Sequence, residues 1–202
     1  TGSSVGANKK GVLSIIAPLP PGCSQTVWGD NKRFVSTYFS KSNGNFLYST
    51  FDYAKYDDDG YYFMLGRTDD VINVSGHRIG TREIEEVIQN YKNVVETTVV
   101  GVFDETKGQV PVAFIVPKEN QIFNDHNKKI EETSKIKELI NRQLGPFARP
   151  NKVYFVSLLP KTRSGKLLRR AIQAVLENKD AGDLTTLEDP SSLEEIKRII
   201  HE

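Results

Sequence analysis

Apolar and polar positions divide the chain into two regions with different periods. Short apolar runs bounded by Gly, Pro, Asn, Asp or Ser predict β-strands. The predicted strands are residues 12–16, 46–50, 61–65, 71–74, 97–103, 110–116 and 152–158. Three of them come before residue 66 with no clear helical period between them, so the first region is predicted to be β-rich.

Clear helical periods occur only in the second region. Ile84, Val87, Ile88 and Tyr91 recur at i, i+3, i+4 and i+7, which predicts a helix that begins just after the turn at Ser75 and Gly76. Further helices are predicted at residues 134–144, at residues 167–175 and after Pro190, where Ser191 and Glu194 form a capping box. Residues 120–129 are polar and are predicted to form a loop.

This order of elements predicts an α+β fold. Residues 1–66 read as the end of an all-β region, and residues 67–70 as a connection. Residues 71–176 form a small α+β domain, a three-stranded sheet with flanking helices plus a β-hairpin. Residues 177–202 complete the chain as a helical tail.

Composition narrows the function classes. The 202 residues carry a formal net charge of +1, which gives no global reason to expect nucleic acid or a membrane surface as a partner. Cys23 is the single cysteine, so neither an internal disulfide nor a cysteine-rich zinc site is possible. No apolar run approaches the roughly 18 residues of a membrane span. A small molecule or a protein is therefore the expected partner.

Two local motifs each allow more than one structural or functional interpretation. Asp57, Asp58, Asp59 and Gly60 resemble a calcium loop, but Gly66 stands where the sixth position after the glycine requires glutamate, so we interpret them as a turn. The basic residues between positions 160 and 170 could equally form a solvated face or a nucleic-acid patch. A Walker phosphate loop is excluded there, because its required Ser/Thr and its first glycine are both missing.

Longer motifs carry a resemblance to a known family. Residues 66–81 (GRTDDVINVSGHRIGT) and 159–170 (LPKTRSGKLLRR) resemble the two C-terminal core motifs of the AMP-forming acyl-CoA synthetases, members of the adenylate-forming superfamily. Residues 48–52 (YSTFD) extend the match upstream. The sequence of these motifs resembles the short-chain branch of the family, and residues 108–118 and 182–191 favour propionate over acetate.

The resemblance implies a two-step reaction. A carboxylate and ATP form an acyl-adenylate and pyrophosphate, and the thiol of coenzyme A (CoA) then displaces AMP. It implies ATP or AMP, CoA, propionate or acetate, and Mg²⁺ brought with ATP, but no nucleic acid or membrane partner. It also implies a cytoplasmic protein, or a mitochondrial matrix protein in a eukaryote.

Several residues match the adenylation motifs. Asp52 matches the aspartate that accepts hydrogen bonds from the ribose hydroxyls, although Phe51 replaces the usual preceding glycine. Arg67 matches a second ribose contact. Lys166 matches the lysine whose charge stabilises the adenylation transition state.

Other residues match positions that the family uses in the transfer of the acyl group to CoA. Asp69 matches a hinge about which the C-terminal domain rotates, and residues 67–70 match the hinge segment. Ser75 and Gly76 would line the pantetheine tunnel, and Arg78 matches a phosphate contact. The arginine for the CoA nucleotide falls by counting at Asn141, so we assign it to the adjacent Arg142. The family's magnesium positions fall near residues 89–94 and mostly use backbone, so no side-chain metal site is expected.

The family's phosphate loop and acyl pocket lie outside these residues. The chain therefore resembles the C-terminal third of the enzyme, with the end of the large adenylation domain attached, and is expected to need the missing N-terminal domain. Alone, it should not catalyse adenylation efficiently. Two alternatives stay open: a related domain with a carrier-protein thiol as acceptor, and a non-catalytic binding or regulatory module.

Overall fold

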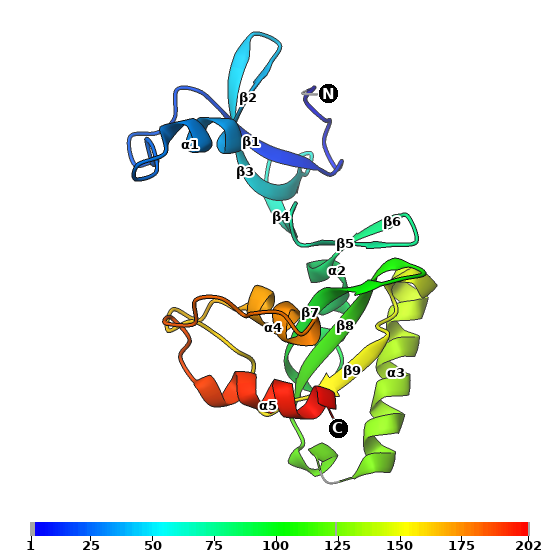
Figure 1. Ribbon diagram of the computed structural model, residues 1–202. Helices are drawn as coiled ribbons and strands as arrows, with labels where there is room; N and C mark the ends of the chain where they lie inside the picture. The colour runs from blue at the N-terminus through cyan, green and yellow to red at the C-terminus, as the bar shows by residue number, and fades with distance from the viewer. Residues whose placement is uncertain (1–2, 124, 202) are drawn as a thin grey trace. The chain divides into compact units, whose positions relative to one another are not determined.

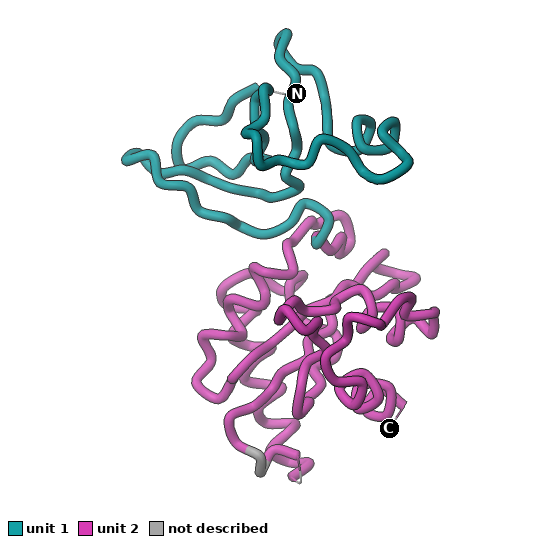
Figure 2. The backbone as a smooth tube through the Cα atoms, turned by 90° about the vertical axis from the view of Figure 1, so that its left-hand side faces the viewer, with its two compact units in different colours: residues 1–70 teal, residues 71–202 magenta. Residues whose placement is uncertain are grey.

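The computed structural model describes residues 3–123 and 125–201 of the chain. It divides into two compact units, residues 1–70 and residues 71–202, which Figure 2 shows in different colours. Each unit has its own sheet, and each is described separately below.

The first unit is built around one long strand. Its elements are β1 (Gly11–Ile16), α1 (Asn31–Tyr38), β2 (Phe39–Ser42), β3 (Asn45–Tyr56) and β4 (Tyr62–Arg67). The strands β1, β2 and β4 all pair antiparallel with β3. The β-rich prediction is confirmed, but α1 was not predicted. Phe34 of α1 is buried and lies against the rings of Tyr38 and Phe39, a packing that the weak aromatic pattern did not reveal.

In the described residues of the second unit there are a mixed sheet and four helices (Figure 1). Its strands are β5 (Val71–Val74), β6 (His77–Gly80), β7 (Val94–Asp104), β8 (Gly108–Pro117) and β9 (Lys152–Phe155). Its helices are α2 (Thr81–Gln89), α3 (His126–Leu144), α4 (Arg169–Leu176) and α5 (Pro190–His201), with short 3₁₀ turns η1 (Asn120–Phe123) and η2 (Pro146–Ala148). The sheet order is β6-β5-β8-β7, and β9 pairs parallel with β8. The hairpin β5–β6 joins the three-stranded core through one residue pair, Val74 and Gly108. Strand β6 was not predicted, so α2 begins at Thr81 and not directly after the turn at Ser75 and Gly76.

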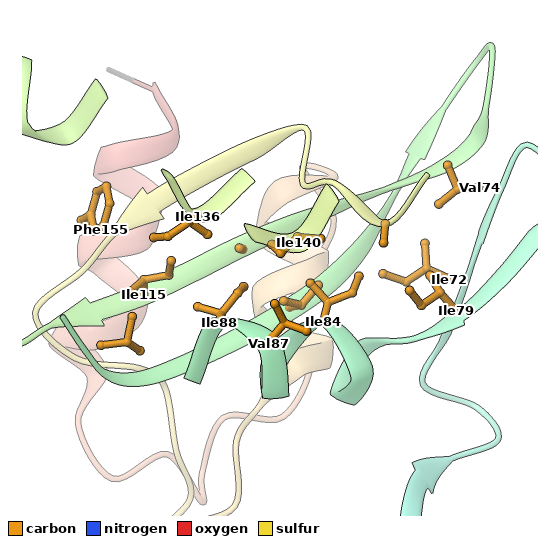
Figure 3. Packing of buried hydrophobic residues seen from close by; sticks show 14 of the residues in the cluster. Ile72, Val74, Ile79, Ile84, Val87, Ile88, Ile115, Ile136, Ile140 and Phe155 are labelled. Atoms are coloured by element: carbon orange, nitrogen blue, oxygen red, sulfur yellow. The ribbon is translucent and has the colours of Figure 1, made fainter. Parts of the chain in front are cut away.

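Alternate strand residues point to opposite faces of the sheet, and helices cover both faces. Val99, Ala113 and Ile115 face one core with apolar residues of α2 and α3, and Figure 3 shows Ile88 of α2 beside Ile115. Val100 and Phe114 face a second core with apolar residues of α4 and α5. Ala171, Ile172 and Val175 of α4 belong to this second core, in agreement with the helix predicted at residues 167–175, although α4 begins at Arg169.

Three local predictions need correction. The polar segment 120–129 is not all loop, because α3 begins at His126, where the Asp125 side chain caps the helix by accepting the Lys128 N–H at 3.0 Å. The final helix begins at Pro190, so its cap is Asp189, whose carboxylate accepts the Ser191 N–H at 2.8 Å. Strand β9 ends at Phe155 and not at residue 158.

Candidate functional site

In the first unit, three of the predicted site residues lie together. Asp52 of β3 stands opposite Arg67 of β4 in the strand register. The Arg67 guanidinium is 3.7 Å from the Asp52 carboxylate and donates to both carboxylate oxygens of Asp69, at 2.9 and 3.3 Å. This paired hydrogen bond raises the pKa of Arg67. Arg67 therefore links the expected ribose residue to the expected hinge residue.

Phe51 takes the backbone conformation that a glycine would favour. Its φ of 60° lies in the left-handed region, which costs an ordinary side chain about 1–2 kcal/mol. Its carbonyl accepts the Thr68 N–H at 2.8 Å, and the Arg67 guanidinium lies over its ring at 5.8 Å. The backbone setting before Asp52 is thus compatible with glycine although the residue is phenylalanine.

In the second unit, Ser75 and Gly76 form the two-residue turn between β5 and β6. Both have positive φ, 50° and 88°, as a type I′ hairpin turn requires. The Ser75 N–H donates to the Lys107 carbonyl at 2.8 Å, which fixes the turn to the β7–β8 hairpin. A side chain at Gly76 would meet no atom within 4 Å, so open space borders this backbone. Arg78 is exposed on β6.

A positively charged pocket of about 400 Å³ adjoins this turn. Ser75 lines it together with Lys107, Lys137 and Arg149. The Lys137 ammonium donates to the Asn151 carbonyl at 2.8 Å, and its burial, followed by the nearby charge of Arg149, lowers the pKa of Lys137. Three cations around one opening are suited to a ligand with several phosphate groups.

Aromatic stacking forms one wall of the same pocket. Phe147 lines the pocket and stacks on His77, with ring centroids 4.8 Å apart. His77 therefore has a packing role in the turn. Arg142 does not line this pocket; its side chain is 72% exposed and pairs with Glu138 at 2.7 Å. The structure thus brings Ser75 together with Lys137 and Arg149 and does not bring it together with Arg142.

The predicted catalytic lysine lies on a tight loop. Thr162 organises this loop: its N–H donates to the Lys166 carbonyl at 2.9 Å, and its hydroxyl accepts the Lys166 N–H at 3.1 Å. The Thr162 carbonyl accepts the Gly165 N–H, and Gly165 has a φ of 82°. The Lys166 side chain is exposed, so its backbone is fixed while its charge can reach outward.

Two ion pairs anchor this loop to the sheet and to α2. The Lys161 ammonium lies 2.7 Å from the Glu96 carboxylate at the start of β7. Arg169, at the start of α4, donates to both oxygens of Glu85, at 2.7 and 3.0 Å. Glu85 is only 12% exposed and also accepts the Val99 N–H. Glu85 therefore joins α2, β7 and α4 at one point.

The lysine loop and the Ser75 turn are anchored at opposite ends of β7. The loop is held at Glu96, whereas the turn contacts Lys107, just beyond Asp104 at the other end of the strand. Eight residue steps separate Glu96 from Asp104, which corresponds to roughly 26 Å along a strand at ~3.3 Å per residue. One small unit therefore presents two separate candidate surfaces.

Sequence reasoning did not identify Lys137, Arg149 or Glu85. Lys137 lies in a polar stretch of α3 and Arg149 follows η2, so only the fold brings them to Ser75. Glu85 lies in α2, far in sequence from the loop that it anchors. Its distance of 84 residues from Arg169 leaves no local signal of their pairing.

The described parts of the chain contain no metal cluster and no spanning helix. Within residues 3–123 and 125–201, no three His, Cys, Asp or Glu side chains gather as a metal site. Over the same ranges, none of the helices has the length and apolar character needed to cross a membrane.

Comparison with known proteins gives a match to one protein-domain family. Residues 83–166 match the AMP-binding enzyme C-terminal domain. This match, together with the relatives described below, confirms the predicted resemblance to the C-terminal portions of AMP-forming acyl-CoA synthetases.

Relatives extend the match over the whole chain. The chain is 56% identical to propionate–CoA ligase from Salmonella typhimurium over 202 residues, 100% of this chain and 32% of the ligase. It is 45% identical to acetyl-coenzyme A synthetase from Pyrobaculum aerophilum, over 96% of this chain and 28% of that enzyme. The chain thus spans about a third of the length of these curated relatives.

A solved structure supports the fold. ATP-bound MatB from Rhodopseudomonas palustris superposes with a TM-score of 0.71 over 88% of this chain and 32% of its own, at 24% identity. At this identity the likeness concerns the fold alone, and it agrees with the predicted α+β class.

Proposed function

We propose that this chain is the C-terminal portion of an AMP-forming acid–CoA ligase. The reaction joins a short carboxylic acid to CoA and converts ATP to AMP and pyrophosphate, with propionate favoured over acetate. The single observation that carries the proposal is the separation of the Lys166 loop from the Ser75 turn on one small unit. Two chemically different surfaces suit an enzyme that presents them in turn to one adenylate.

In the first step, a carboxylate oxygen attacks the α-phosphorus of ATP and pyrophosphate leaves. Lys166 contributes a positive charge to the oxygens on which negative charge develops. Asp52 would accept the ribose hydroxyls, and Arg67 would make the second ribose contact. The surrounding N-terminal domain would supply the phosphate loop and the acyl pocket. Mg²⁺ would arrive with ATP.

In the second step, the CoA sulfur attacks the acyl carbon and AMP leaves. We propose that Ser75 and Gly76 border the pantetheine arm, because the space beside Gly76 is open. Arg78 would contact a phosphate. Lys107, Lys137 and Arg149 of the neighbouring pocket would bind the CoA phosphates. They are alternatives to Arg142 as the residues that contact the CoA nucleotide. Asp69, held by Arg67, would act as the hinge.

The CoA pocket is tested by a matched pair of substitutions in the full-length ligase. Loss of a charge-assisted hydrogen bond of about 1.5–3 kcal/mol should raise the KM for CoA by roughly 10- to 100-fold in Arg149→Ala. Arg142→Ala is the control and should change it little, and carboxylate-dependent ATP–pyrophosphate exchange should survive in both. A large effect of Arg142→Ala with none of Arg149→Ala would return the assignment to Arg142.

Substrate class is tested by an acid and acceptor panel. The relatives at 56% and 54% identity are propionate–CoA ligases, whereas the acetyl-coenzyme A synthetase is at 45%. We therefore expect kcat/KM to be higher for propionate than for acetate, with CoA as acceptor, and we expect a cytoplasmic enzyme. Turnover with a carrier-protein thiol and none with CoA would refute the CoA assignment.

A further inference from the structure

The segment between α4 and α5 pairs with the Lys166 loop. The Arg163 N–H donates to the Thr186 carbonyl at 3.1 Å, and the Glu188 N–H donates to the Lys161 carbonyl at 2.9 Å. Thr162 and Leu187 form an antiparallel bridge between these two hydrogen bonds. Residues 184–188, a turn followed by this single bridge and named here the tail strand, thus pair with the loop that carries Lys166.

The tail strand is itself firmly held. Leu187 is 8% exposed and belongs to the second core with Leu193 of α5. The Leu187 N–H donates to the Leu184 carbonyl at 2.9 Å, which closes a turn before the bridge. At the other side, Glu195 of α5 accepts the Ser157 N–H at 3.0 Å, just before the lysine loop. The loop therefore lies against a segment that is anchored from both sides.

We propose that the tail strand is a positioning element for Lys166. The Lys166 side chain is exposed, so its location depends on the backbone of its loop. Thr162 closes the loop internally, and the tail strand supplies the partners of Lys161 and Arg163. Without the tail strand these backbone groups would bond to water and the loop would sample more conformations. A displacement of about 1 Å at a catalytic group can cost roughly 100-fold in rate.

This inference rests on the proposed adenylation role of Lys166 and predicts a selective defect. In the full-length ligase, Leu187→Ala removes the buried anchor while leaving every loop side chain in place. Carboxylate-dependent ATP–pyrophosphate exchange should fall about tenfold or more, whereas thioester formation from supplied acyl-adenylate should change less than about threefold. Leu187→Met, a conservative change, should restore exchange to near the wild-type rate.

Two controls separate positioning from general destabilisation. Ile140→Ala deletes a similar buried side chain from the core on the other face of the sheet, on α3, and should spare the exchange rate. Leu187→Val is a milder variant, and it should show a smaller defect of the same kind if Leu187→Ala folds poorly. Equal losses of exchange in Ile140→Ala and Leu187→Ala would overturn the proposal.

A second readout does not need catalysis. Amide hydrogen exchange across residues 161–166 should be at least about tenfold faster in Leu187→Ala than in wild type or in Ile140→Ala. Unchanged protection of these amides would overturn the positioning role. If wild-type ligase instead lacked adenylation altogether, the proposed function would fail, while the amide exchange would still decide whether the tail strand orders the loop.

Discussion

The ion pair between Arg169 and Glu85 should contribute strongly to the stability of the second unit. We consider Arg169→Leu, which keeps the apolar stem and removes the guanidinium. The side chains are 29% and 12% exposed, and three guanidinium–carboxylate hydrogen bonds of 2.7, 3.0 and 3.2 Å join them. Removing one partner leaves the Glu85 charge largely buried at the junction of α2, β7 and α4.

The expected loss of stability depends on the hydrogen bonds that Glu85 retains in Arg169→Leu. Breaking a fully buried pair costs about 3–5 kcal/mol. Glu85 retains the Val99 N–H at 2.8 Å and the Thr98 hydroxyl at 3.2 Å, and Arg169 is partly solvated. We therefore expect a loss of about 2 kcal/mol in the free energy of unfolding. The double variant with Glu85→Gln should lose less than the sum of the two single losses.

Urea denaturation of the 202-residue chain, followed by far-UV circular dichroism, measures this loss. Arg82→Leu is the matched control, because Arg82 pairs with Glu86 on the same helix as Glu85 but both side chains are more than half exposed. Its loss should be about 0.3–0.5 kcal/mol. If Arg169→Leu lost no more than Arg82→Leu, the proposed anchoring of α4 through Glu85 would be refuted.

Three further predictions concern other parts of the chain. Burial of Glu132 opposes its charge, but hydrogen bonds, foremost from Lys135, lower the pKa of its carboxyl group overall. The ionised Glu132 should therefore stabilise the fold fully above about pH 4.3, the ordinary glutamate pKa, and this stabilisation should be lost as the pH falls through the folded-state pKa. Urea titrations should thus show a deficit for Glu132→Gln at pH 7 that shrinks at pH 3, and a pH-independent deficit would contradict this. Gly76→Ala should destabilise the chain by about 1 kcal/mol through its positive φ, and Gly76→Asn by less; equal losses would exclude the backbone cause. Asp69→Asn, which weakens the pair with Arg67, should alter the ratio of adenylation to thioester formation in the full-length ligase more than Asp70→Asn does, and an equal effect of both would argue against a hinge role for Asp69.

Much of the fold was predictable because its signals are local. The strands β7 and β8 are β-branched runs, and the faces of α2 and α4 repeat at helical spacing. Helix α1 was missed because its stability comes from Phe34 and its aromatic neighbours, not from a periodic face. The first two turns of α3 were missed because their residues are polar and the Asp125 cap was overlooked.

The candidate site was predictable where a motif carries it. The turn at Ser75 and the loop at Lys166 are continuous in sequence, so their residues could be named beforehand. The pocket of Lys137 and Arg149 is assembled from α3 and the segment after η2, and the tail strand reaches the loop across more than 20 residues. Such long-range contacts depend on tertiary packing and leave no pattern in a single sequence.

The separation of two surfaces on one unit is tested most directly by measuring both half-reactions in the full-length ligase. Lys166→Ala should lower carboxylate-dependent ATP–pyrophosphate exchange by at least about 100-fold and leave thioester formation from supplied acyl-adenylate nearly intact. Arg149→Ala should do the reverse, sparing exchange and raising the CoA requirement. Parallel loss of both half-reactions in Lys166→Ala, or full exchange without the lysine, would contradict the account.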